Sequence, residues 1–141
     1  MAGSAEMARP GAQLQMYVDH QSGLVRWRAL GGNRRELARG FDAYPDVRTC
    51  ELSLVELIGS GPELTARVES RGLSQWTWVL ERLGTPIAGA AFGFDRRTRC
   101  AESCRRFLEA LPHATVLPDL LMNRRRHVPA AGDPLDALET A

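Results

Sequence analysis

The chain resembles itself when it is shifted by fifty residues, and this internal repetition constrains the fold more than any other feature. With one residue of slack in a turn, Val25 and Trp27 also fall on Trp76 and Trp78. Repetition at this period indicates two copies of one supersecondary unit. The pairs that keep their order and chemical character are Val18 with Val68, Asp19 with Glu69, Leu37 with Ile87, Ala38 with Ala88, Tyr44 with Phe94, Cys50 with Cys100, Ser53 with Ser103 and Leu57 with Phe107.

Each copy begins with residues that predict three strands. The first strands are expected over 14–18 and 64–69, and the second over 25–29 and 76–81. The second strands alternate apolar and polar residues, which is typical of a half-buried strand. The turns that follow contain Gly31-Gly32-Asn33 and Gly84, which favour tight hairpins into third strands over 36–41 and 86–92. Gly40 and Gly89-Ala90-Ala91 predict a close approach of a helix to the sheet.

The spacing of apolar residues then becomes helical in both copies. We expect Pro45 in the first helical turn and Asp95 as an N-cap, with Gly59 and Pro112 as stops. A last strand is predicted over 113–117. The two apolar stripes are Val47, Cys50, Leu54, Leu57 and Ile58 in the first copy, and Cys100, Cys104, Phe107, Leu108 and Leu111 in the second.

These elements predict an α+β fold: a tandem duplication of a βββα unit, with an antiparallel sheet and two helices packed on one face. The first repeat is expected over residues 13–60 and the second, with its closing strand, over 61–119, and the two form one compact domain. Residues 1–12 and 120–141 are small, Pro-rich or acidic and are predicted to be largely disordered tails. Trp27, Trp76 and Trp78 are interpreted as core residues rather than as the lining of a ligand pocket.

The order of features in each copy resembles the YegP-like family of small bacterial tandem-repeat proteins. An aromatic strand, a Gly/Asn turn, Leu-Ala or Ile-Ala, an aromatic residue and a helix follow one another, and the run 111–119 (LPHATVLPD) completes the pattern. The resemblance covers residues 13–119 and implies an intimately packed pair of βββα repeats. It implies no catalytic residue. The family's Asn-Gly-Glu turn is replaced here by residues 33–36 (NRRE) and 83–86 (LGTP).

The residues that could carry chemistry form no catalytic pattern. The three cysteines lie on the apolar helical stripes, and their odd number fits a reducing compartment better than disulfides. The three histidines lack zinc-finger spacing, and a chain without lysine has no phosphate-loop lysine. We therefore predict a protein that is not an enzyme and has no cofactor and no metal. A chain without a long apolar run or a signal-like start is expected to be cytoplasmic, with no membrane contact.

Arginine provides the strongest polar feature, because all 18 basic residues are arginine although the net charge is only +1. Period-two alternation places Arg26 and Arg28 on the strand face away from Trp27. A basic sheet face could bind the backbone of RNA or single-stranded DNA, and a solvated charged face is the simpler alternative. The candidate contact residues of the first hairpin are Arg26, Arg28, Arg34, Arg35 and Arg39.

Three functional hypotheses remain. The leading one is a non-enzymatic module that binds another macromolecule or a second copy of itself as a homodimer, because strand edges invite pairing. The second is nucleic-acid binding through the arginine-rich hairpin. The third is a small-molecule or thiol-redox role that uses the cysteines.

Overall fold

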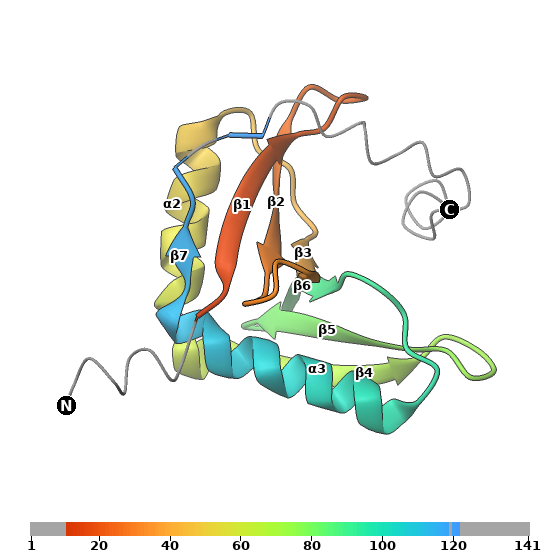
Figure 1. Ribbon diagram of the computed structural model, residues 1–141. Coiled ribbons are helices and arrows are strands. Elements are labelled where there is room, and N and C mark those ends of the chain that lie inside the picture. Colours follow the sequence, from red (N-terminus) through yellow and green to blue (C-terminus); the bar gives the residue numbers. More distant parts are fainter. Residues whose placement is uncertain (1–10, 119, 122–141) are drawn as a thin grey trace.

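The described part of the chain has a mixed α+β fold with one seven-stranded sheet and two α-helices (Figure 1). A computed structural model describes residues 11–118, 120 and 121. The strands are ordered β4-β5-β6-β3-β2-β1-β7, and every pairing is antiparallel except the parallel one between β1 and β7. The elements are β1 Gln13–Val18, β2 Val25–Leu30, β3 Glu36–Gly40, α2 Val47–Ile58, β4 Leu64–Ser70, β5 Trp76–Arg82, β6 Thr85–Ala90, α3 Arg97–Ala110 and β7 Thr115–Val116, with short 3-10 helices over Gly61–Glu63 and Leu111–His113.

The strands lie close to the predicted segments, although the last one spans only Thr115–Val116 and not 113–117. One pair in the fifty-residue alignment of the sequence was wrong. In the first hairpin Met16 pairs with Trp27, and in the second Val68 pairs with Trp78. The structural counterpart of Val68 is therefore Met16, and the sequence alignment with Val18 was displaced by two residues. A shift of two leaves the same set of side chains on the inner face, so the alternating pattern alone could not distinguish the two alignments.

Both helices begin later than the sequence predicted. Asp46 is the N-cap of α2, and its carboxylate accepts a hydrogen bond from the Thr49 backbone N–H at 2.7 Å. Pro45 therefore precedes the helix and does not lie in its first turn. Arg96 is the N-cap of α3 and makes no side-chain cap, so the prediction of Asp95 was wrong. Asp46 caps α2 because its carboxylate reaches an N–H of the first turn that has no partner within the helix, whereas the N-cap residue of α3 makes no such bond.

The core lies where both helices meet the sheet. α2 packs on β1, β2 and β7, and α3 packs on β3, β4 and β5. The Trp78 ring is fully buried and stacks on Phe107 of α3, with the ring centroids 5.4 Å apart. Trp27 is buried too, whereas Trp76 is half-buried beneath the Arg97 guanidinium. The prediction of a tryptophan core is confirmed for Trp27 and Trp78.

Two glycines are required by aromatic rings and not by a helix. A Cβ at Gly40 would lie 2.1 Å from Nε1 of Trp27, and one at Gly89 would lie 2.8 Å from Cζ of Phe41. For these two glycines the predicted close approach of a helix was therefore wrong. A glycine in a strand leaves room for the side chain of a neighbouring segment close to the backbone.

The two halves of the sheet join through β3 and β6. Arg39 pairs with Gly89, and this pair is flanked by Ala38 with Ala90 and by Gly40 with Ala88. Beyond it, the Phe41 N–H donates to the Ile87 carbonyl at 2.9 Å, and the Ala91 N–H donates to the Leu37 carbonyl at 3.2 Å. A shift of fifty residues exchanges the two flanking pairs, exchanges the two hydrogen bonds, and maps the Arg39–Gly89 pair onto itself.

The described chain extends slightly beyond both ends of the predicted repeats. Ala12 is buried and its carbonyl accepts a hydrogen bond from the Thr115 N–H at 3.0 Å. The Leu121 N–H donates to the Met16 carbonyl at 2.9 Å. Residues 1–10 and 122–141 of the two predicted tails lie outside the described residues. Within the described part of the chain, neither helix is long and apolar enough to cross a membrane.

Candidate functional site

Three of the five candidate arginines are paired with neighbouring side chains. Arg26 Nε lies 3.2 Å from Asp19 Oδ2. Arg39 makes a two-pronged contact with Glu36, donating from Nε at 2.8 Å and from Nη2 at 3.0 Å. Arg28 Nη1 lies 3.7 Å from the same carboxylate, and Arg28 Nε donates to Gln15 Oε1 at 2.8 Å. The Glu36 side chain is only 6% exposed, so this cluster is a largely buried ionic network on the sheet face.

Arg34 and Arg35 lie apart from that network, in the turn between β2 and β3. Both are exposed, and neither forms an ion pair with another described residue. Arg34 has a φ of 64°, so it adopts the left-handed conformation that the sequence had suggested for the neighbouring glycines. The structure thus does not bring the five arginines into one unpaired patch. Nucleic-acid binding by this hairpin stays a prediction that would depend chiefly on Arg34 and Arg35.

The three cysteines face the core and form no disulfide. Burial raises the pKa of the Cys50 thiol and of the Cys104 thiol to about 11, and it raises the pKa of Cys100 as well. A raised pKa keeps each thiol in its protonated, weakly nucleophilic form at neutral pH. Across residues 11–118, 120 and 121, no group of three or more His, Cys, Asp and Glu side chains is placed to hold a metal ion.

We expect all three thiols to resist a disulfide reagent in the folded protein at pH 8 and to react fully after denaturation. At that pH a thiol with a pKa of about 11 is roughly one part in a thousand thiolate, and burial also blocks the reagent. The measurement is a colorimetric thiol titration with and without guanidinium. A fast-reacting thiol in the native protein would contradict this burial and support the redox hypothesis.

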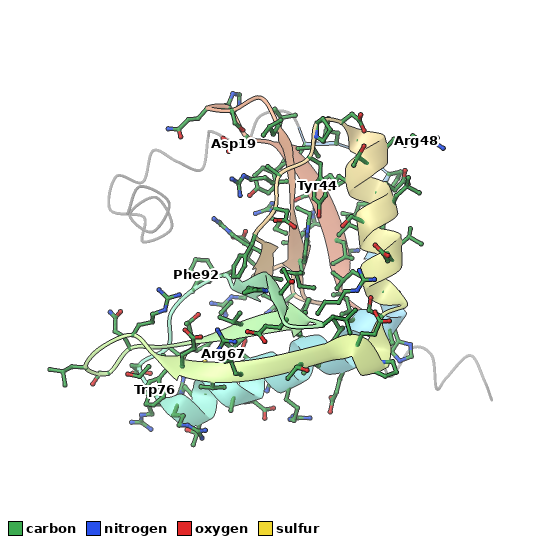
Figure 2. The ribbon with its side chains drawn as sticks, turned by 180° about the vertical axis from the view of Figure 1, so that it is seen from behind. Asp19, Tyr44, Arg48, Arg67, Trp76 and Phe92 are labelled. Carbon is green, nitrogen blue, oxygen red and sulfur yellow. The ribbon has the colours of Figure 1, made fainter. Side chains whose placement is uncertain are left out.

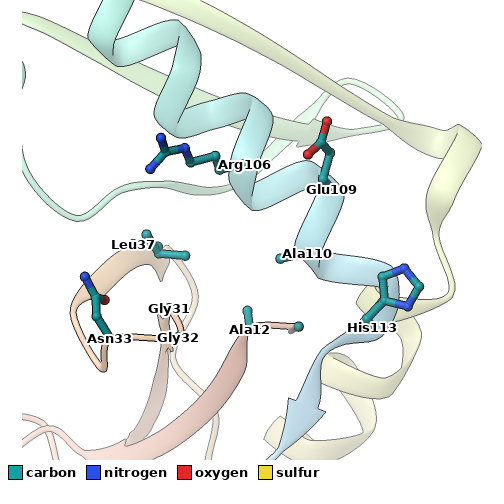
Figure 3. Close-up of a pocket in the computed structure, with 10 residues that line it drawn as sticks. Ala12, Gly31, Gly32, Asn33, Leu37, Arg106, Glu109, Ala110 and His113 are labelled. Carbon is teal, nitrogen blue, oxygen red and sulfur yellow. The ribbon is translucent and has the colours of Figure 1, made fainter. Parts of the chain in front are cut away.

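A cleft of about 730 Å³ lies between the β2–β3 turn and the C-terminal end of α3 (Figure 3). Its charged groups are already engaged, because Arg106 pairs with Glu102 and Glu109 pairs with Arg105. Most of its polar lining is exposed, so the cleft is a surface hollow and carries no buried polar group that would select a ligand. The lining residues are Gly11, Ala12, Gly31, Gly32, Asn33, Leu37, Arg106, Glu109, Ala110 and His113.

The strand β4 forms one edge of the sheet. β4 pairs with β5 on one side, and among the described residues no strand lies on its other side. The Leu83 N–H donates to the Glu63 carbonyl at one end of the β4–β5 pairing, and the Arg71 N–H donates to the Gln75 carbonyl at the other. These two bonds show which facing pairs of residues in β4 and β5 are hydrogen-bonded. Odd-numbered residues of β4 therefore bond to β5, because the bonding direction alternates along an antiparallel strand. The backbone N–H and C=O groups of Ala66, Val68 and Ser70 point outward.

Charged side chains line the same strand on the face away from the core. Arg67, which is labelled in Figure 2, pairs with Glu69 at 2.7 Å and also with Glu81 of β5. Leu64, Ala66 and Val68 pack against the core from the other face. The sequence predicted a strand over 64–69, which contains these apolar residues. It carried no signal that β4 would be an edge, because strand order depends on contacts between distant segments.

Comparison with known proteins bears on the fold. No model of a known protein family matches the chain, and no curated protein matches it. Among solved structures, the solution NMR structure of yegP from E. coli, a protein of unknown function, matches with a TM-score of 0.59 at 11% sequence identity. The match covers 81% of this chain and 94% of that chain. At this identity the likeness shows the fold alone, so the chain has a YegP-like fold.

Proposed function

We propose that the protein is a non-enzymatic interaction module that binds its partner by adding a strand along the outer edge of β4. The observation that carries the proposal is the outward-pointing row of backbone groups at Ala66, Val68 and Ser70. An edge strand with such a row is a template for an added strand, whose main-chain hydrogen bonds supply affinity. Side chains that flank the edge then supply specificity.

The scaffold that presents this edge is, we propose, a tandem duplication of a βββα unit with both helices on one face. The fifty-residue symmetry of the β3–β6 bonds supports it. The bridges of Val25 with Tyr44 and of Trp76 with Phe94 also correspond between the copies. Buried residues of both helices belong to one core cluster, which supports their placement on the same face. In the first copy the equivalent edge is occupied, because β1 carries β7 on its outer side.

The binding test uses a synthetic peptide with the sequence of residues 64–72, titrated into the isotopically labelled protein. We expect the largest amide shifts in the NMR spectrum at Ala66, Val68 and Ser70. The variant Ala66→Pro should fold and lose these shifts, because it removes an outward N–H and leaves the bonds from β4 to β5 in place. Thr65 is the matched control, because its N–H points to β5: Thr65→Pro should destabilise the sheet instead. Shifts confined to other strands would contradict the proposal.

A further inference from the structure

We propose that the partner at this edge is a second copy of the chain, paired antiparallel through β4 in a register centred on Val68. The inference rests on the proposed function, since it names the occupant of the same edge. In this register Val68 faces Val68 of the second copy, and Ala66 faces Ser70 of the second copy. All of these residues point their backbone groups outward, so each facing pair can exchange both N–H···O bonds.

Charge complementarity selects this register over its neighbours. Centred on Val68, the pairing places Arg67 directly opposite Glu69 of the second copy, and the two-fold symmetry repeats that contact. In a register centred on Arg67, this arginine would face Arg67 of the second copy. In a register centred on Glu69, the Glu69 carboxylates of the two copies would face each other. Like charges directly opposite each other destabilise a strand pair, so both neighbouring registers are disfavoured.

The exposed apolar side chains near β4 support the same arrangement. Leu73, in the turn after β4, is 96% exposed, and Leu83, in the turn after β5, is 75% exposed. Leu83 lies beside the start of β4, because its N–H donates to the Glu63 carbonyl at 3.2 Å. In the register centred on Val68, the hairpin tip with Leu73 of one copy approaches the start of β4 in the other. Pairing would thus bring two exposed leucines of different copies toward each other.

Two charge-reversal variants, measured separately and as a mixture, test the register of the pairing. Arg67→Glu leaves two carboxylates facing each other at both symmetric contacts, and Glu69→Arg leaves two guanidiniums. By analytical ultracentrifugation each single variant should dimerise about tenfold or more weakly than the wild type. An equimolar mixture should form a heterodimer, because the Arg67→Glu chain then presents only carboxylates to the guanidiniums of the Glu69→Arg chain. Circular dichroism of each variant checks that it is folded.

The outcomes separate this inference from the proposed function. A mixture that stays as weakly associated as the single variants would overturn the register. A wild-type chain that remains monomeric at millimolar concentration, yet shows peptide shifts at Ala66, Val68 and Ser70, would overturn self-pairing and leave edge binding intact. A wild-type dimer that is unaffected by both charge reversals and by Ala66→Pro would place the contact elsewhere and overturn both.

Discussion

Gly40→Ala is expected to lower the free energy of unfolding by about 3 kcal/mol, at the upper end of what overpacking costs in a protein core. A Cβ at this position would lie 2.1 Å from Nε1 and 2.3 Å from Cε2 of Trp27, which is closer than any non-bonded contact allows. Trp27 is buried in the core, so the ring cannot move away without displacing its neighbours. The measurement is guanidinium unfolding followed by circular dichroism.

Gly32→Ala is the matched control, because a Cβ there would meet nothing within 4 Å. Both substitutions add the same methyl group to the first repeat, so they share the effect of alanine on the unfolded chain. The control should stay within about 0.5 kcal/mol of the wild type. Equal stability of the two variants would mean that the Trp27 ring does not lie over Gly40.

The role of Gly40 shows where prediction from the sequence ends. Alternation placed Trp27 on the inner face, and helical spacing predicted the buried side of α2 and α3, because both patterns are local. The partner of Gly40 could not be predicted, since it depends on the register between β2 and β3. The sequence likewise aligned Val18 with Val68, whereas the strand pairing makes Met16 the counterpart of Val68. A shift of two keeps the inner face unchanged, so alternation could not reveal the error.

The order of the strands in the sheet was a second feature that the sequence could not predict. The sequence predicted antiparallel pairing throughout, whereas β7 pairs with β1 in parallel, because the chain returns along that edge only after α3. This return occupies one edge of the sheet and leaves β4 as the other. The candidate site at Ala66 and Val68 follows from this difference between the two edges of the sheet. A repeat alignment treats both copies alike, so it could not distinguish the occupied edge from the one without a neighbouring strand.

Arg26, Arg28 and Arg39 lie on the strands where the sequence placed them, but their electrostatic role could not be derived from the sequence. The register of β2 and β3 sets Arg28 directly opposite Arg39. Two like charges in that position repel, and Glu36 offsets the repulsion by contacting both. In the sequence Glu36 is one of several acidic residues near these arginines. Only the strand register shows that it is the one between the two guanidiniums.

Glu36→Gln is therefore expected to cost about 2 kcal/mol of unfolding free energy, because it leaves two largely buried arginines facing each other. Their side chains are 13% and 15% exposed, so water replaces the lost carboxylate poorly. The stability of this variant should rise with added salt, which screens the repulsion between the guanidiniums. Glu109→Gln, at an exposed carboxylate that pairs with Arg105, is the matched control and should change stability little.

The double variant Arg28→Gln with Glu36→Gln separates repulsion from the loss of hydrogen bonds. If repulsion between Arg28 and Arg39 causes the loss, removing one guanidinium should restore part of the stability and abolish the salt dependence. If the double variant is less stable than Glu36→Gln by the full cost of Arg28→Gln alone, the two effects are additive. Additivity would show that Glu36 acts on these two arginines only as a hydrogen-bond acceptor.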